Sequence, residues 1–77
     1  MTETELNFLK TQIDKVVLLE TVQGQRLLIE VMVVFDEGET PDMFGLEVEQ
    51  TPTGYAKKGS SGISILLADI ASVQSAP

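Results

Sequence analysis

The chain has 77 residues, no cysteine and no histidine, and it carries a formal net charge of −7 from twelve acidic and five basic residues. The lack of cysteine excludes disulfides, thiolate metal sites and a cysteine nucleophile, and the negative charge disfavours strong nucleic-acid binding, which depends on Lys and Arg. Apolar residues make up 43% of the chain, which is more than one small core easily buries, and this favours a homo-oligomer.

The N-terminal segment has the pattern of a short amphipathic helix. Thr2 stands three residues before Glu5, as in a capping box. Three apolar residues then recur at helical spacing: Leu6, Leu9 and Ile13. We expect a helix over about residues 3–13 that covers one end of a barrel. Phe8 lies off the apolar stripe and is free to contact a neighbouring subunit.

A hairpin follows. Residues 16–19 are continuously apolar, and Gln23-Gly24 stands where a turn is needed before the long strand 26–35. One face of that strand is entirely apolar: Leu27, Ile29, Val31, Val33 and Phe35. The opposite face is mixed: Leu28, Glu30, Met32 and Val34. A strand of this kind fits a barrel wall whose outer side is partly covered.

The second half of the chain predicts three more strands. An acidic loop over 36–42 precedes a strand over 43–49, with Phe44, Leu46 and Val48 on one side and Glu47 and Glu49 on the other. Residues 51–62 are rich in Gly, Pro and Ser and predict a long connection. Two short strands, 64–67 and 70–74, are joined at an Ala68-Asp69 corner, and 75–77 form a frayed tail.

This order of one helix and five strands resembles the Sm-like family. The matching motifs are the turn glycine Gly24, the Phe35-Asp36 pair, Met43 and the apolar segment 65–73. The resemblance implies a single Sm-like domain over 1–77, mainly β, with the N-terminal helix followed by a strongly bent, five-stranded SH3-type barrel over about 15–74. The stretch from Gly24 to Phe35 is one residue longer than is usual in the family, and a β-bulge would absorb the extra residue.

The resemblance also implies a cyclic homo-oligomer, in which the fourth strand of one subunit pairs with the fifth strand of the next. The expected interface residues lie in these two strands: Ser64, Ile65, Leu66, Leu67, Ile70, Ala71, Ser72 and Val73. The alternative is that the two strands close the barrel of their own subunit and leave a monomer.

Sm-like proteins that bind uridine-rich RNA use three pocket residues, and the corresponding positions here are Asp42, Phe44 and Leu67. None of the three can take the family role, because Asp42 repels phosphate, Phe44 has no polar edge and Leu67 has no charge. The remaining candidates for RNA contact are three bases and one aromatic ring: Lys57, Lys58, Arg26 and Phe44. Phe44 is also explained as a core or interface aromatic.

Two alternative functions therefore remain open. The family implies a ring that binds single-stranded RNA weakly or through a non-standard face. The charge and the replaced pocket residues favour a ring that serves as a structural or protein-interaction module. Carboxylates at 36, 37, 39 and 42 are candidate ligands for calcium or magnesium, but their spacing is not that of an EF-hand loop, and no metal or other cofactor is expected.

No motif supports an enzyme, because the chain lacks histidine and cysteine and no nucleophile motif surrounds its serines. The start of the chain has no signal-peptide pattern, and no apolar run approaches the roughly 20 residues that cross a bilayer. We therefore expect a cytoplasmic protein without a membrane partner.

Overall fold

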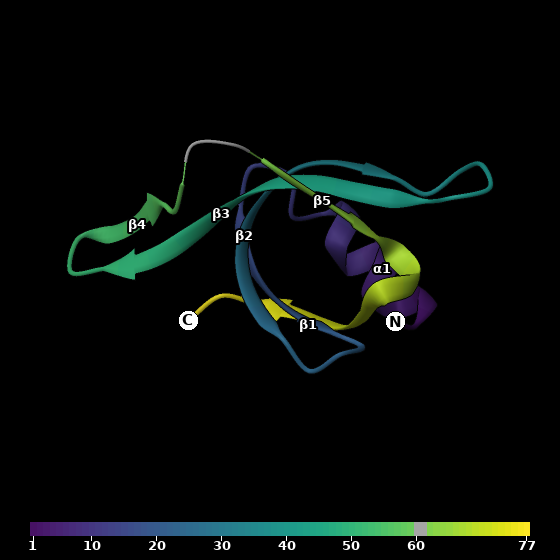
Figure 1. Ribbon diagram of the computed structural model, residues 1–77, viewed down its shortest axis with the longest axis horizontal. Helices are drawn as coiled ribbons and strands as arrows, with labels where there is room; N and C mark the ends of the chain where they lie inside the picture. The colour runs from purple at the N-terminus through teal and green to yellow at the C-terminus, as the bar shows by residue number, and fades with distance from the viewer. Residues whose placement is uncertain (60–61) are drawn as a thin grey trace.

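The computed structural model describes residues 1–59 and 62–77 (Figure 1). The elements in chain order are α1 (Glu3–Lys10), β1 (Val16–Thr21), β2 (Arg26–Phe35), β3 (Asp42–Thr51), β4 (Gly54–Lys57), β5 (Ile63–Leu66), the 3₁₀ turn η1 (Leu67–Asp69) and β6 (Ile70–Ser75). The prediction of a mainly β chain with one N-terminal helix is confirmed. No helix among the described residues combines the length and the apolarity that crossing a membrane requires.

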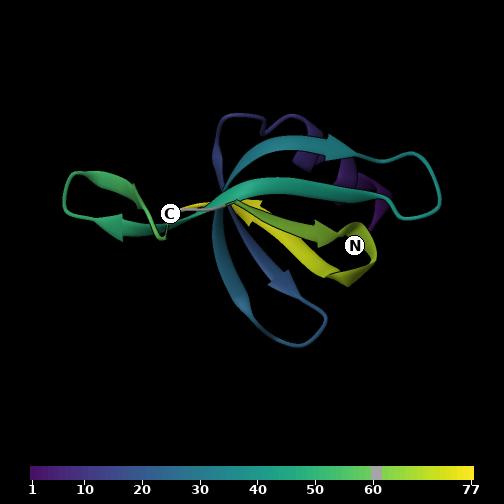
Figure 2. The same cartoon turned by 45° about the horizontal axis from the view of Figure 1, so that its top comes forward.

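The strands form one antiparallel sheet in the order β4-β3-β2-β1-β6, with β5 added to β3 beside this path. The sheet curves around α1, as the two views in Figures 1 and 2 show. Because β5 pairs with β3 and β6 pairs with β1, the described strands do not close into a complete barrel. The expected strongly bent barrel of five strands is therefore corrected to an open, curved sheet of six strands.

The helix begins as the capping box predicts. The Glu5 amide donates to the Thr2 hydroxyl at 3.1 Å, and the Thr2 amide donates to a Glu5 carboxylate oxygen at 3.0 Å. The helix ends earlier than predicted, at Lys10, because the backbone turns at Thr11, whose amide and hydroxyl both donate to the Phe8 carbonyl oxygen. Ile13 consequently lies outside the helix and is exposed.

The predicted bulge occurs in β2, where the pairing with β3 shifts between Val31 and Val33. An extra residue in one strand moves the side chains of the following residues to the opposite face of the sheet. Ile29 and Val31 are fully buried before the bulge, and Val34 packs against the core after it. The prediction that Val33 and Phe35 share a face with Ile29 and Val31 is therefore wrong.

The predicted connection over 51–62 contains a strand. β4 pairs with β3 from Val48 and Lys57 to Thr51 and Gly54, and the two strands form a hairpin that extends away from the body of the molecule (Figures 1 and 2). The same pairing lengthens β3 beyond its predicted end. Residues 60 and 61 of the predicted connection lie outside the described residues.

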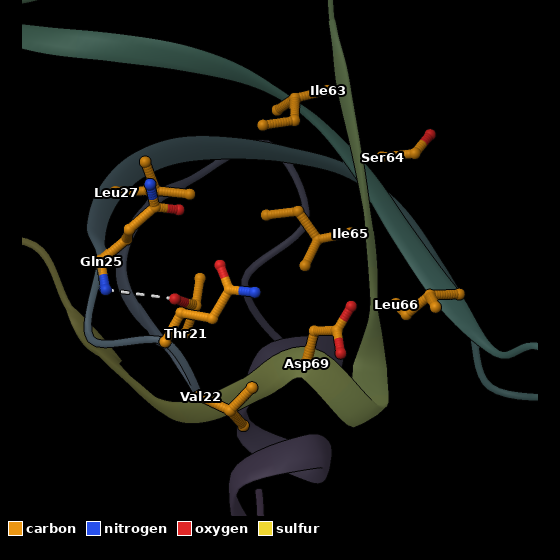
Figure 3. A pocket seen from close by; sticks show the side chains of 10 residues that line it. Thr21, Val22, Gln25, Leu27, Ile63, Ser64, Ile65, Leu66 and Asp69 are labelled. Atoms are coloured by element: carbon orange, nitrogen blue, oxygen red, sulfur yellow. Dashed lines mark hydrogen bonds between the residues drawn. The ribbon is translucent and has the colours of Figure 1, made fainter.

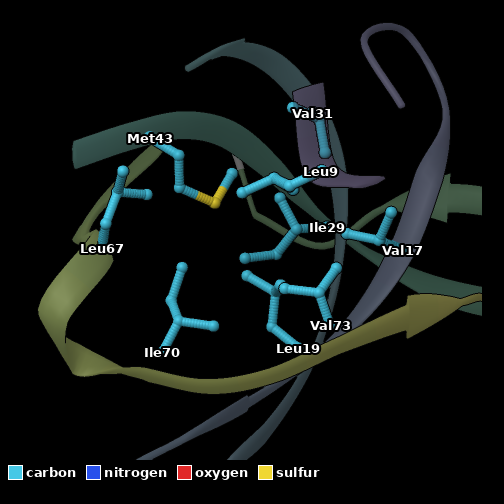
Figure 4. Close-up of a cluster of buried hydrophobic side chains, with 9 residues drawn as sticks. All are labelled: Leu9, Val17, Leu19, Ile29, Val31, Met43, Leu67, Ile70 and Val73. Carbon is cyan, nitrogen blue, oxygen red and sulfur yellow. The ribbon is translucent and has the colours of Figure 1, made fainter. Parts of the chain in front are cut away.

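The core lies on the inner face of the sheet, between the strands and α1 (Figure 4). Leu9 is the buried residue of the helix and meets buried aliphatic side chains from the surrounding strands. The core cluster consists of Leu9, Val17, Leu19, Ile29, Val31, Met43, Leu67, Ile70 and Val73. All of the large polar and charged side chains of the described chain remain outside this cluster.

Candidate functional site at the free strand edges

The expected interface residues are divided between β5, η1 and β6, the segments that surround the open side of the sheet. β5 pairs with β3 from Asp42 and Leu66 to Gly45 and Ile63. β6 pairs with β1 along most of its length. Within the described part of the chain, each of these two strands is paired along one edge only, so the site is a pair of free strand edges joined by a tight turn.

The free edge of β5 carries the main-chain groups of Ser64 and Leu66. The Leu67 amide donates to the Pro41 carbonyl oxygen at 2.9 Å, which places Leu67 in a hydrogen-bonded position opposite β3. Because such positions alternate in an antiparallel pair, the amides of Ser64 and Leu66 face away from β3. Both residues are exposed.

The free edge of β6 is partly covered by α1. The Val73 amide, which faces away from β1, donates to the Glu5 carboxylate at 3.1 Å. Glu5 thus bonds to the first turn of its own helix and to a strand 68 residues further along the chain. It also competes with any neighbouring strand for the Val73 donor.

The Glu5 contacts predict a pH dependence of stability. The backbone amide of Thr2, followed by that of Val73, holds the pKa of Glu5 below the ordinary value of 4.5. A carboxylate whose pKa is lowered by folding stabilises the fold above its unfolded pKa, and this stabilisation is lost as the pH falls through the lowered value. We expect thermal melts of the Glu5→Gln variant to depend less on pH below about 4.5 than melts of the parent chain.

The matched control for this prediction is Glu3→Gln, which changes an exposed carboxylate in the same helical turn. This variant is expected to keep the pH profile of the parent chain. Asp36 adds its own contribution to acid sensitivity, because its ion pair with Lys10 lowers the pKa of the Asp36 carboxyl. Identical profiles for Glu5→Gln and the parent chain would contradict the role assigned to Glu5.

A pocket of about 260 Å³ lies between β5 and the β1–β2 turn (Figure 3). Ile63 and Ile65 point into it and face Leu27, whereas Ser64 and Leu66 point away (Figure 3). Its β5 wall is thus apolar, whereas polar side chains such as Thr21, Gln25 and Asp69 line the opposite side. The sequence does not predict this pocket, because its residues come from segments that are far apart in the chain.

The basic candidates for RNA contact do not come together. Arg26 lies at the start of β2, 4.0 Å from the carboxylate of Glu20. Lys58 lies next to the β3–β4 hairpin, 3.7 Å from the carboxylate of Glu47. Lys57 is exposed on β4, which extends away from the β1–β2 turn (Figure 1). Lys57 and Lys58 therefore form no continuous positive surface with Arg26.

The positions that correspond to the Sm-like RNA pocket lack its chemistry. Leu67 is buried in the core, and Asp42 is half-buried at the start of β3. Phe44 lies on the outer face of β3, 39% exposed. Its ring covers Gly62, where a Cβ atom would overlap the ring. Phe44 therefore packs on the backbone beside β5 and not in the core, so that of its two expected structural roles, core or interface aromatic, only the interface role stays a prediction.

One carboxylate of the acidic loop between β2 and β3 has a partner within the chain: Asp36 forms an ion pair with Lys10. A pocket of about 340 Å³ separates this loop from the start of α1. Among the described residues, no group of three or more acidic side chains is arranged to hold a metal ion. The loop thus offers no built cation site in the described chain.

Comparisons with protein-family models, with curated proteins and with solved structures find no match to this chain. The comparisons therefore assign this chain to no family.

Proposed function

We propose that this protein is a ring-forming homo-oligomer of Sm-like architecture that acts as a structural or protein-interaction module. The observation that carries the proposal is that β5 and β6, which flank η1, each pair with a strand along one edge only within the described residues, although α1 partly covers the second edge of β6 through Glu5. Unpaired edges of this kind are seldom left exposed in natural proteins. Pairing of β5 of one copy with β6 of the next is head-to-tail, and head-to-tail contacts that close produce a cyclic ring.

The order of the elements supports the Sm-like architecture. An N-terminal helix is followed by a curved antiparallel sheet, a long second strand, a 3₁₀ turn and a final short strand. The bulge in β2 takes up the extra residue by which the stretch from Gly24 to Phe35 exceeds the family pattern. This departure leaves the two edge strands in the order that the assembly requires.

Sedimentation velocity and native mass spectrometry test the proposal. We expect a discrete species larger than the 8.4 kDa chain, with a mass equal to a whole number of subunits. Its sedimentation coefficient should change little with protein concentration, because a closed ring has no free edge from which to grow. A monomer at all concentrations would overturn the proposal, and a continuous series of polymers would overturn the closed ring.

RNA binding has weaker support than the interaction module, and its test is direct. We expect labelled oligo-uridine and oligo-adenosine to show no binding even at low salt, because the net charge is −7 and two of the candidate bases are near acidic partners. The measurement is fluorescence anisotropy with the parent chain and with the double variant Lys57→Ala, Lys58→Ala. Binding by the parent chain that the double variant weakens equally for both oligonucleotides would contradict this expectation.

A further inference from the structure

The outer face of the sheet has an apolar surface made by three adjacent strands. Residues that are paired across antiparallel strands point to the same face. One row of the pairing runs from Phe35 through Asp42 to Leu66, and the next contains Val33, Phe44 and Ser64. We name the apolar members of these rows the outer patch: Val33, Phe35, Phe44 and Leu66.

The outer patch is exposed although it lies next to a well-filled core. The exposed fractions are 59% for Phe35, 43% for Leu66 and 39% for Phe44. The helix packs on the opposite, inner face of the sheet, where it contributes Leu9 to the core. An antiparallel sheet with one buried face normally presents polar residues on the other, so an apolar surface here points to a binding partner.

Two carboxylates accompany the outer patch. Asp42 stands between Phe35 and Leu66 in the first row, and Glu30 stands opposite Leu46 beyond the second row. Within the described residues, neither carboxylate is part of an ion pair. The partner should therefore bring basic groups together with apolar ones, as the net charge of −7 also favours.

The spacing of the strands limits the shape of the partner. From β2 to β5 the outer patch is two strand spacings wide, about 10 Å, and from Asp42 to Leu46 it is about 14 Å long. An α-helix with its side chains is about 10 to 12 Å across. An extended peptide on the face of a sheet would leave its backbone donors and acceptors unpaired, whereas a helix satisfies its own.

We propose that the outer patch binds an amphipathic helix of a partner protein, with an apolar stripe seated on Phe35, Phe44 and Leu66 and Lys or Arg residues near Asp42 and Glu30. A second copy of this chain is a poorer occupant, because stacking two outer patches would bring like carboxylates together. The proposal concerns the face of the sheet, whereas the proposed ring uses the strand edges, so either one can fail without the other.

The test uses synthetic helical peptides of about 18 residues, in which Leu follows the i, i+3, i+4, i+7 pattern and Lys flanks the stripe. One control peptide has Glu in place of every Lys, and a second has the Lys composition in scrambled order. Fluorescence anisotropy measures affinity, and NMR shift changes identify the surface. We expect the Lys helix to bind at the outer patch, the scrambled peptide to bind at least about tenfold more weakly, and the Glu peptide not to bind.

Two pairs of variants locate the contact. Phe35→Ser removes an exposed ring from the outer patch and should weaken binding of the Lys helix about tenfold or more, whereas Val22→Ser changes a residue that is 60% exposed in the β1–β2 turn and should have no effect. Glu30→Gln should weaken binding, and Glu49→Gln, at an exposed carboxylate of the β3–β4 hairpin, should not.

Four results would overturn the proposal. The first is no binding of the Lys helix, and the second is equal binding of the helical and scrambled peptides. The third is an equal loss of affinity in each variant and its control. The fourth is self-association of the parent chain that Phe35→Ser abolishes, since this would identify a second copy as the occupant of the outer patch.

Discussion

Replacing Leu66 with proline is expected to convert the assembled protein into monomers without unfolding it. Leu66 has φ −64° and ψ 137°. Proline fixes φ near −65°, so a proline residue fits the backbone conformation at this position. The Leu66 amide faces the free edge of β5, where its loss removes a donor that another strand needs and places a proline ring in the way. Sedimentation velocity should give the mass of a single chain.

The matched control is Leu66→Ala, which shortens the same side chain and keeps the amide. Because pairing of strand edges is a main-chain contact, this variant should assemble like the parent chain. Circular dichroism should give the same spectrum for the parent chain and both variants. Assembly of Leu66→Pro with the parent mass would show that the edge of β5 is not the contact, and equal loss of assembly in Leu66→Ala would assign the contact to the side chain.

The strands that the sequence predicted well are those with a strong local pattern. β2 has its predicted bounds, Arg26 to Phe35, because a continuous apolar and β-branched run lies between a turn glycine and an acidic loop. Gly24 has φ +88°, a conformation that favours glycine. The start of the helix is equally local, since Thr2 and Glu5 satisfy each other's amides.

The features that the sequence did not predict depend on pairing between segments. The composition of residues 51–62 is that of a loop, and residues 54–57 become a strand because the end of β3 lies beside them. The bulge was expected, but its place between Val31 and Val33 was not, and that place decides which residues of β2 face the core. The same pairing places the Phe44 side chain on the outer face of the sheet.

The strands that form the candidate site were predicted in part, and their role as an interface stays a prediction. These strands and their residues follow from the apolar runs near the C-terminus and from the resemblance to the Sm-like family. The contact between Glu5 and Val73 had no signal in the sequence, because it joins residues that only the fold brings together. The outer patch was equally hidden, since it depends on the register of three strands.

Gly45 is the residue at which one added methyl group should destabilise the fold most. A Cβ atom there would overlap Cγ2 of Ile29 and would lie 2.6 Å from the carbonyl oxygen of Glu30. That oxygen belongs to the backbone of β2 and cannot move without disturbing the pairing of β2 with β3. We expect Gly45→Ala to lower the free energy of unfolding by about 2 to 3 kcal/mol and the melting temperature by on the order of 10 °C or more.

Gly24→Asn separates this close approach from the general cost of replacing a glycine. Gly24 has open space around its Cα and a positive φ that asparagine tolerates better than most residues. Its substitution should therefore change the free energy of unfolding by less than about 1 kcal/mol, as measured by urea denaturation. If Gly45→Ala lowers the free energy of unfolding no more than Gly24→Asn does, the close approach of the paired strands β2 and β3 at Gly45 is contradicted. That pairing holds β5 in place through β3, so its failure would also remove the geometric basis for the free edge.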